Sequence, residues 1–178
     1  MCVSSFPGNG RVAREPFRGT EFSMHSLTAE YALRAMSCLA MHGNQLVPTT
    51  TLAVQTKVPS NYLAKVLQQL AAAGLITGRR GVGGGYKLSR PNTEIKLLDV
   101  INAVDPVQRI TTCPLGLTNH GSYLCPLHRK ADQAAAAVID IYKGVSLADL
   151  LLDPKSNKPL CDEETTAKLS VKGVLLDE

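Results

Sequence analysis

Apolar residues recur at helical spacing in the first clearly patterned part of the chain, just after Met24. Thr28 suits an N-cap, and a glycine that suits a helix end follows at Gly43. Between them, apolar residues separated by three or four positions lie on one face of a helix: Ala32, Ala35, Met36 and Leu39. The pattern therefore predicts a first helix between Thr28 and Gly43 that buries one face.

Two further helical patterns follow within a few residues of each other. Pro48 and the threonines at 49–51 are typical of a helix start, and this short helix extends to about Lys57. The next helix begins at Pro59 or Ser60, and Gly74 occupies a typical C′ position. Its apolar stripe has the spacing i, i+3, i+4, i+7 and consists of Leu63, Val66, Leu67 and Leu70. Two short helices joined by a tight turn predict a helix-turn-helix.

Two alternating segments, at 75–77 and 86–89, predict strands on either side of a glycine-rich tip at 78–85. Five of the eight residues in this tip are glycine, which permits the backbone angles of a tight hairpin. We expect a wing there, then a short helix from Leu97 to Val104. The predicted fold class is mainly α with a small β-wing: a winged helix-turn-helix over 24–105.

The rest of the chain divides into a loop and a helix. Residues 106–128 are irregular and rich in Cys, Pro, Gly and His, and 129–152 are predicted to be a long helix. Its apolar residues form a stripe with two further positions beside it: Ala131, Ala135, Val138 and Tyr142, with Ala134 and Ile141. We prefer a dimer seam for this helix over packing on its own domain. Residues 1–23 are expected to be a disordered extension and 153–178 a polar tail.

Charge is unevenly distributed along the 178 residues. Residues 1–96 hold 11 Lys and Arg against four Asp and Glu, whereas 97–178 hold eight against 11, which gives the net charge of +4. The first half is therefore the one that suits a polyanion, although an ordinary solvated surface has the same composition. The sequence lacks a signal-like start and any apolar run of roughly 20 residues, so we expect a cytoplasmic protein with no membrane contact.

The second helix of a helix-turn-helix enters the major groove of double-stranded DNA with its N-terminal residues. The candidates for base contacts are therefore Ser60, Asn61, Tyr62 and Lys65. At the wing tip, Arg79 and Arg80 are flanked by glycines and suit phosphates or a narrow minor groove. The alternative for each set is a polar surface that only contacts water.

The chain resembles the Rrf2 family of bacterial regulators over roughly residues 24–150. The resemblance rests on three stretches of sequence: Glu30-Tyr31-Ala32-Leu33-Arg34, then Tyr62-Leu63 through Leu70 to Gly74-Leu75, then Arg80-Gly81 with Gly84-Gly85-Tyr86. It implies a homodimer joined by long crossing helices that binds a palindromic operator. It also implies that, in members that sense iron or redox state, a cluster loop precedes the dimer helix.

The usual ligands of that loop are three cysteines at six-residue intervals, sometimes followed by a histidine. Here Cys113, Cys125 and His128 match the pattern, but Asn119 replaces the middle cysteine, with His120 beside it. Some relatives add an acidic residue from the partner's first helix, at the position of Glu30. The resemblance therefore implies a possible 2Fe-2S cluster held by Cys113, Cys125, Glu30 and either His128 or His120.

Two other interpretations of the loop stay open. Cys113 and Cys125 fit a thiol switch without metal, since a nearby cation such as Arg129 lowers a thiol pKa. They also fit inert residues in a regulator that responds to a ligand or a protein partner. The other three cysteines are not expected to be ligands. Cys38 fits a buried apolar residue, Cys2 lies in the extension and Cys161 lies in the tail.

The leading hypothesis is a transcriptional regulator and not an enzyme. An iron-sulfur or thiol oxidoreductase is a poor alternative, because the chain has no Cys-x-x-Cys pair and no nucleotide-binding fingerprint. A winged helix used only for protein contacts is the remaining class, and it has no need of an arginine-tipped wing.

Overall fold

The computed structural model describes residues 25–116 and 123–152. The expectations for 1–23, for His120 and for the tail at 153–178 lie outside the described residues. Among the residues that the structure describes, no helix combines the length and the apolar character that a membrane span needs.

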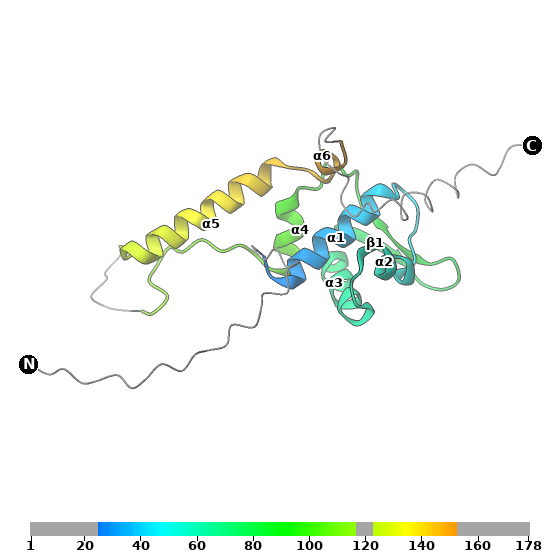
Figure 1. The fold of residues 1–178 in the computed structure, drawn as a ribbon, viewed down its shortest axis with the longest axis horizontal. Helices are drawn as coiled ribbons and strands as arrows, with labels where there is room; N and C mark the ends of the chain where they lie inside the picture. The colour runs from blue at the N-terminus through cyan, green and yellow to red at the C-terminus, as the bar shows by residue number, and fades with distance from the viewer. Residues whose placement is uncertain (1–24, 117–122, 153–178) are drawn as a thin grey trace, which may run out of the picture.

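Helix α1 (Leu27–Met41) runs through the centre of the folded body (Figure 1). Its N-cap is Ser26, whose side chain accepts a hydrogen bond from Ala29 N at 3.2 Å. The expected cap at Thr28 is wrong, because this residue already lies in the first turn. The helix ends at Met41, and Gly43 follows with a φ of +60°, as its position predicted.

Helices α2 (Thr49–Thr56) and α3 (Ser60–Ala72) form the predicted helix-turn-helix. The apolar stripe of α3 is buried against α1 together with Leu52 and Val58. Gly74 has a φ of +70° just past the end of α3, which confirms the expected C′ glycine.

The wing consists of β1 (Ile76–Arg79) and β2 (Gly85–Leu88), paired antiparallel with Ile76 opposite Leu88. Val47 forms an isolated β-bridge to β2, because its N–H and C=O each bond to Tyr86 at 2.9 Å. The first strand begins one residue later than predicted and continues through Arg79. The tip is therefore shorter than the expected 78–85.

Helix α4 (Leu97–Val104) has the predicted bounds, whereas the helix expected over 129–152 is two helices. Helix α5 (Pro126–Gly144) begins three residues earlier and points away from the body (Figure 1), and α6 (Leu147–Leu152) returns to the core. The helix breaks because Ser146 and Asp149 cap α6 reciprocally, with the Asp149 carboxylate accepting from Ser146 N and Oγ at 2.7 Å. Buried Leu147 then holds α6 in place.

Candidate nucleic-acid interface and thiol loop

The outer face of α3 carries the residues expected to read DNA. Ser60, Asn61, Tyr62 and Lys65 are all exposed, because the apolar stripe of α3 turns the opposite side toward α1. Tyr62 and Lys65 also line a groove of about 580 Å³ that extends from the start of α1 to the end of α4. The structure thus places these four side chains together on one free helix face.

Tyr62 is additionally connected to the first helix. Its ring centroid lies 6.3 Å from that of Tyr31, in an edge-to-face contact, and the Arg34 guanidinium lies 5.9 Å from the Tyr31 ring centroid. Arg34 forms an ion pair with Glu30 and donates a hydrogen bond to Thr56 O at 3.5 Å. Sequence reasoning gave Arg34 no role, although its i,i+4 spacing from Glu30 is the signal for such a pair.

The turn between α2 and α3 depends on one unusual backbone conformation. Lys57 has a φ of +54° and ψ of 33°, which is the left-handed region, and it is the only described non-glycine residue with a positive φ. The two residues after it direct the chain into α3, with Val58 buried and Pro59 as N-cap. This turn sets the angle at which α3 is presented.

The wing and the start of α2 form a basic groove of about 570 Å³. Thr49 and Thr50 line one side of it, and Arg79 and Arg80 line the other. Arg79 was expected at the tip, but it ends β1 and its side chain donates to Gly83 O at 3.3 Å, across the hairpin. Arg80 lies in the tip itself and is exposed, as predicted.

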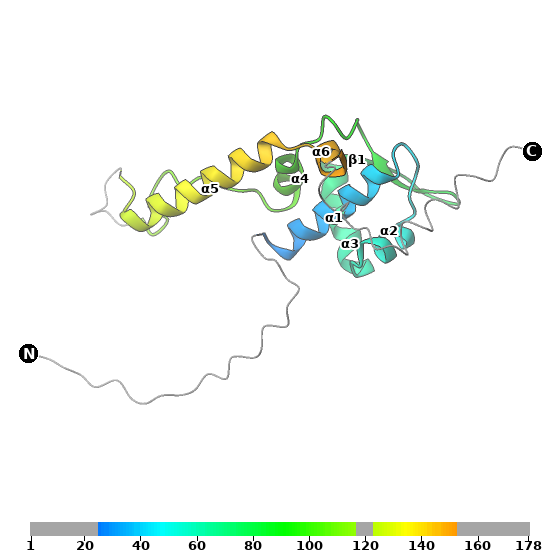
Figure 2. The ribbon, with the colours of Figure 1, turned by 45° about the horizontal axis from the view of Figure 1, so that its top comes forward.

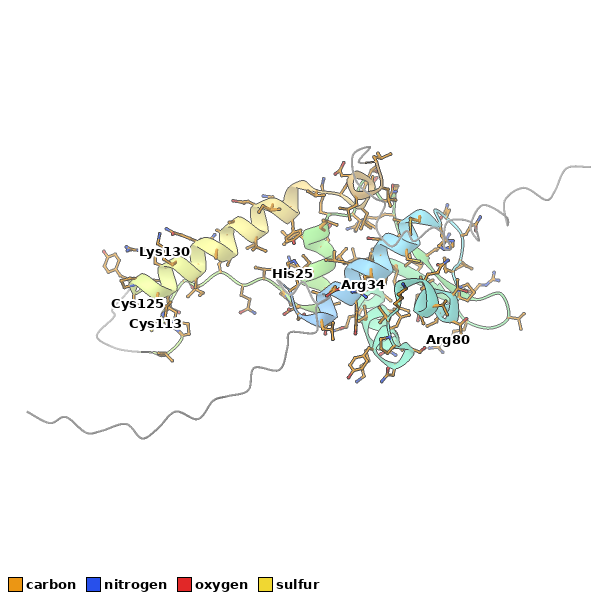
Figure 3. The ribbon with its side chains drawn as sticks, in the orientation of Figure 1. His25, Arg34, Arg80, Cys113, Cys125 and Lys130 are labelled. Atoms are coloured by element: carbon orange, nitrogen blue, oxygen red, sulfur yellow. The ribbon has the colours of Figure 1, made fainter. Side chains whose placement is uncertain are left out.

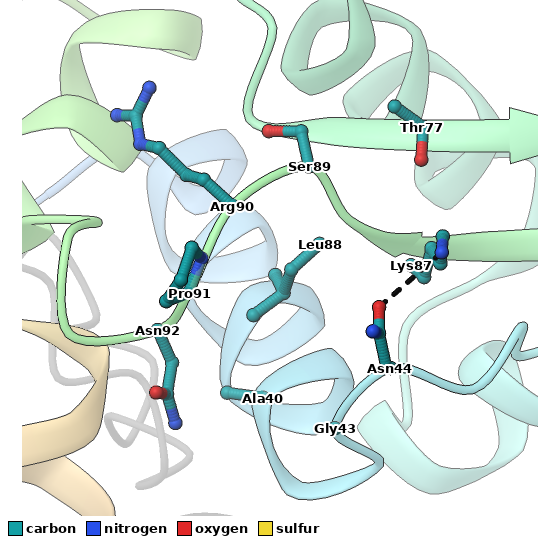
Figure 4. Close-up of a pocket in the computed structure, with 10 residues that line it drawn as sticks. All are labelled: Ala40, Gly43, Asn44, Thr77, Lys87, Leu88, Ser89, Arg90, Pro91 and Asn92. Carbon is teal, nitrogen blue, oxygen red and sulfur yellow. Dashed lines mark hydrogen bonds between the residues drawn. The ribbon is translucent and has the colours of Figure 1, made fainter.

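A smaller hollow of about 380 Å³ lies between the end of α1 and the segment that follows β2 (Figure 4). Lys87 Nζ donates to Asn44 Oδ1 at 3.3 Å inside it. Arg90 also lines the hollow but points outward, where it pairs with Asp99 at 3.3 Å. Because both cations have partners in the fold, we assign no ligand to this hollow.

The described residues Cys113, Cys125 and His128, which we call the thiol loop, lie at the start of α5, far from Arg80 in the wing (Figure 3). Cys125 is the N-cap residue of α5, and its Sγ lies 3.3 Å from Nδ1 of His128. His128 therefore belongs to the first turn of the helix and not to the loop that was expected to end at 128. Cys113 lies at the same end of α5 as Cys125, and both are half-buried.

The structure does not bring the whole proposed ligand set together. Glu30 lies on α1, in the body of the chain, where it pairs with Arg34. Within the described ranges, no three His, Cys, Asp or Glu side chains form a group able to hold a metal ion. Cys38 is buried, as expected; burial raises the pKa of its thiol to about 11, and the thiol donates to Gln55 Oε1 at 3.1 Å.

Comparison with known proteins decides the family. The model of the Rrf2 family, described as iron-dependent transcriptional regulators, matches residues 25–153. The chain belongs to the Rrf2 family.

Named relatives of this Rrf2 protein agree with that assignment. The HTH-type transcriptional regulator IscR of Aliivibrio salmonicida (strain LFI1238) is 31% identical over 124 residues, which cover 69% of this chain and 74% of IscR. The crystal structure of Staphylococcus aureus CymR is 26% identical with a TM-score of 0.58, over 74% of this chain and 100% of CymR. T. potens IscR has a similar fold, with a TM-score of 0.60 at 24% identity over 74% of this chain and 88% of that one.

As an Rrf2 protein, the chain is a DNA-binding transcriptional regulator, and its family consists of regulators and not of enzymes. The winged helix-turn-helix fold expected from the sequence is therefore confirmed. The individual DNA contacts and the contents of the thiol loop stay predictions.

Proposed function

We propose that this Rrf2 regulator binds a palindromic operator as a homodimer and responds to redox or iron-sulfur status through Cys113, Cys125 and His128. The observation that carries the DNA-binding part is the combination of a free polar face on α3 with the basic groove beside it. Asn61 and Lys65 then contact base edges in the major groove, and Arg80 contacts phosphates or the minor groove.

Substitutions separate these two roles. An operator is first selected from random duplex DNA with the wild-type protein. Arg80→Ala is then expected to weaken binding to operator and random DNA by similar factors, because phosphate contacts carry no sequence information. Asn61→Ala is expected to weaken operator binding alone. Lys130→Ala is the matched control, because it removes one cation from α5, distant from the wing (Figure 3). Equal effects of Arg80→Ala and Asn61→Ala on both DNAs would contradict the assignment.

The dimer proposal rests on the outer face of α5. Its apolar residues Leu127, Ala131, Ala134, Val138 and Ile141 alternate in steps of four and three, which is the spacing of a helix-helix seam. Leu127 is 72% and Ile141 64% exposed within the single chain. The stripe expected from the sequence instead ran through Ala135 and Tyr142. Both are half-buried, and Tyr142 contacts His25, with its Oη 2.6 Å from Nε2 of His25.

Ala134→Glu tests the seam, because it places a charge among small apolar contacts. Gln133→Glu adds the same charge one residue away, outside the stripe. We expect sedimentation equilibrium to give a monomer for Ala134→Glu and a dimer for Gln133→Glu. A dimer for both would contradict the proposed seam.

The donor set at the start of α5 fits a 2Fe-2S cluster in its chemistry. Thiolates are the usual ligands of such clusters, and an imidazole can replace a thiolate on one iron. Cys125 and His128 already converge within 3.3 Å, so they would hold one side of the cluster, with Cys113 beside them. Glu30 of the partner subunit would complete the set, with His120 as the alternative to His128. When bound, the cluster supplies an iron centre that changes redox state.

Anaerobic visible absorption, with iron and sulfide analysis, tests this assignment on wild type, Cys125→Ser and Cys38→Ser. We expect absorption that is lost in Cys125→Ser and kept in Cys38→Ser, because the Cys38 thiol is committed to Gln55. Colourless, iron-free protein after reconstitution would contradict the cluster. Sensing would then rest on the thiol chemistry of Cys113 and Cys125 without metal, or on a ligand or protein partner.

A further inference from the structure

One carboxylate on α5 receives three hydrogen bonds from the segment that leads into the thiol loop. Arg109 Nε donates to Asp132 Oδ1 at 2.6 Å, and Arg109 Nη2 donates to Oδ2 at 2.7 Å. The backbone N–H of Ile110 donates to the same Oδ1 at 2.9 Å. We call these three contacts, from Arg109 and Ile110 to Asp132, the clamp. The clamp fixes the direction of the segment and its position along the axis of α5.

The clamp acts on a segment that has no regular structure of its own. Residues 106–112 contain no helix or strand and run beside α5 toward its start (Figures 1 and 2). Near the start of the segment, Val107 N donates to the Asn102 side chain at 3.2 Å. The Asp132 contacts are therefore the connection nearest to Cys113 that joins this segment to α5.

The position of the clamp matches the positions of the two cysteines. Asp132 follows Cys125 by seven residues, and a helix rises about 1.5 Å per residue, so the two lie about 10 Å apart along α5. Cys113 follows Ile110 by three residues, and because the chain bends at residue 112 and an extended chain covers about 3.4 Å per residue, it lies at most about 10 Å further along. Because the segment and α5 run in opposite directions, the clamp brings Cys113 level with Cys125.

We propose that Arg109 and Asp132 are positioning residues of the thiol loop, which hold Cys113 at the height of Cys125 and His128. This inference rests on the proposed sensing role of that loop. It gives a positioning role to Arg109 and Asp132, which are not among the proposed cluster ligands. The side chain of Asp132 is only 17% exposed, whereas that of Arg109 is 51% exposed, so the carboxylate is the better shielded partner.

The electrostatics of the pair agree with a permanent contact. Hydrogen bonds from Arg109 are the main cause that lowers the pKa of Asp132 to about 2, and the pKa of Arg109 is raised in turn. The carboxylate is therefore charged near neutral pH.

The test measures how readily Cys113 and Cys125 meet, without any cluster. The full chain, with Cys2→Ser and Cys161→Ser, is equilibrated with glutathione and glutathione disulfide under anaerobic, iron-free conditions. In this exchange the two protein thiols are oxidised to one disulfide, and one glutathione disulfide is reduced to two glutathione thiols. Mass spectrometry of the 113–125 crosslink gives the effective concentration of one thiol at the other.

Asp132→Asn and Arg109→Gln are each expected to lower this effective concentration about tenfold, toward the millimolar range of a flexible linker. Exchanging the pair, with Arg109→Asp and Asp132→Arg together, is expected to recover part of the loss. Gln133→Ala, next to the clamp and bonded only to Lys130 at 3.1 Å among the contacts described, is expected to leave the value unchanged.

An unchanged or higher effective concentration in Asp132→Asn and Arg109→Gln would overturn the inference, even if thermal stability fell. A loss in the single variants with recovery in the exchanged pair supports it. DNA affinity of the reduced and oxidised wild type is measured in parallel. Equal affinities would count against thiol-based sensing by the loop and leave the positioning result intact.

Discussion

At Gly85 the wing lies directly against the backbone that leads into α2, so Gly85→Ala tests how the wing is held. A Cβ at this position would lie 2.4 Å from the carbonyl oxygen of Val47, 2.5 Å from its carbonyl carbon and 2.9 Å from Pro48 N. All three atoms are backbone, which cannot rotate away as a side chain does. The residues of β2 and Val47 must therefore separate.

The cost follows from what that separation breaks. The two hydrogen bonds between Val47 and Tyr86, both 2.9 Å, each contribute about 1 kcal/mol net. Overpacking at a tight contact adds about 1–3 kcal/mol. We therefore expect Gly85→Ala to lower the free energy of unfolding by roughly 3–5 kcal/mol, which corresponds to about 10 °C in the melting temperature.

Denaturant titration followed by far-UV circular dichroism measures this change. Gly144→Ala is the matched control, because a Cβ there has no neighbour within 4 Å at the end of α5. It is expected to be neutral or to stabilise by up to about 1 kcal/mol, as alanine does in a helix. A loss below about 0.5 kcal/mol for Gly85→Ala, within the range of an ordinary surface change, would refute the reasoning.

Four further predictions use the same structure. Lys57→Gly is expected to stabilise the fold by up to about 1 kcal/mol in chemical denaturation, because glycine adopts the left-handed conformation without steric cost. Ser26→Ala is expected to cost about 1 kcal/mol as the loss of an N-cap, whereas Thr28→Ala changes little; the reverse order would restore Thr28 as the cap. The pKa of Asp132 is lowered from 3.8 to about 2, so its contribution to stability is complete above about pH 4 and lost as the pH falls toward 2; acid titrations of wild type and Asp132→Asn should converge there. Cys38, with its pKa raised to about 11, is expected to resist iodoacetamide at pH 8 in the native state, as mass spectrometry of the labelled peptides would show.

Local signals in the sequence were enough to predict the helix-turn-helix and the helix from Leu97 to Val104. In α3, the apolar stripe and Gly74 act within one or two turns, so spacing alone fixes the buried face. The prediction of one helix over 129–152 was wrong, because the break between α5 and α6 does not follow from residue spacing. Alanine before Ser146 and leucine after it both favour helix, and the break depends on a cap plus burial of Leu147, which is a tertiary contact.

The clamp could not be predicted from residue spacing. Arg109 and Asp132 are 23 residues apart, and their contact depends on the segment running antiparallel to α5. Arg79 illustrates the same limit on a shorter scale, because its position at a strand end is set by pairing with Gly85 across the hairpin. From residue type alone, Arg79 and Arg80 are both surface cations. Only the fold shows that Arg79 bonds across the wing, whereas Arg80 lies in the tip.

The two ends of α5 lie in different parts of the molecule: its C-terminal end joins the body, and its N-terminal end carries Cys125 and His128. Its C-terminal end is joined to the body by main-chain bonds, from Leu97 N to Val145 O at 3.0 Å and from Leu147 N to Ile95 O at 2.9 Å, and by the contact of Tyr142 with His25. Its N-terminal end depends on the side chains of the thiol loop and the clamp. With 19 residues α5 is about 28 Å long, so a change of about 5° in its direction displaces one end relative to the other by about 2.5 Å. In a dimer whose subunits contact each other along α5, the two recognition helices must reach half-sites about 34 Å apart. A displacement of that size is a large part of one base-pair step. If the proposed sensing role of the loop holds, it would therefore act on DNA affinity by tilting α5 and not by contacting α3.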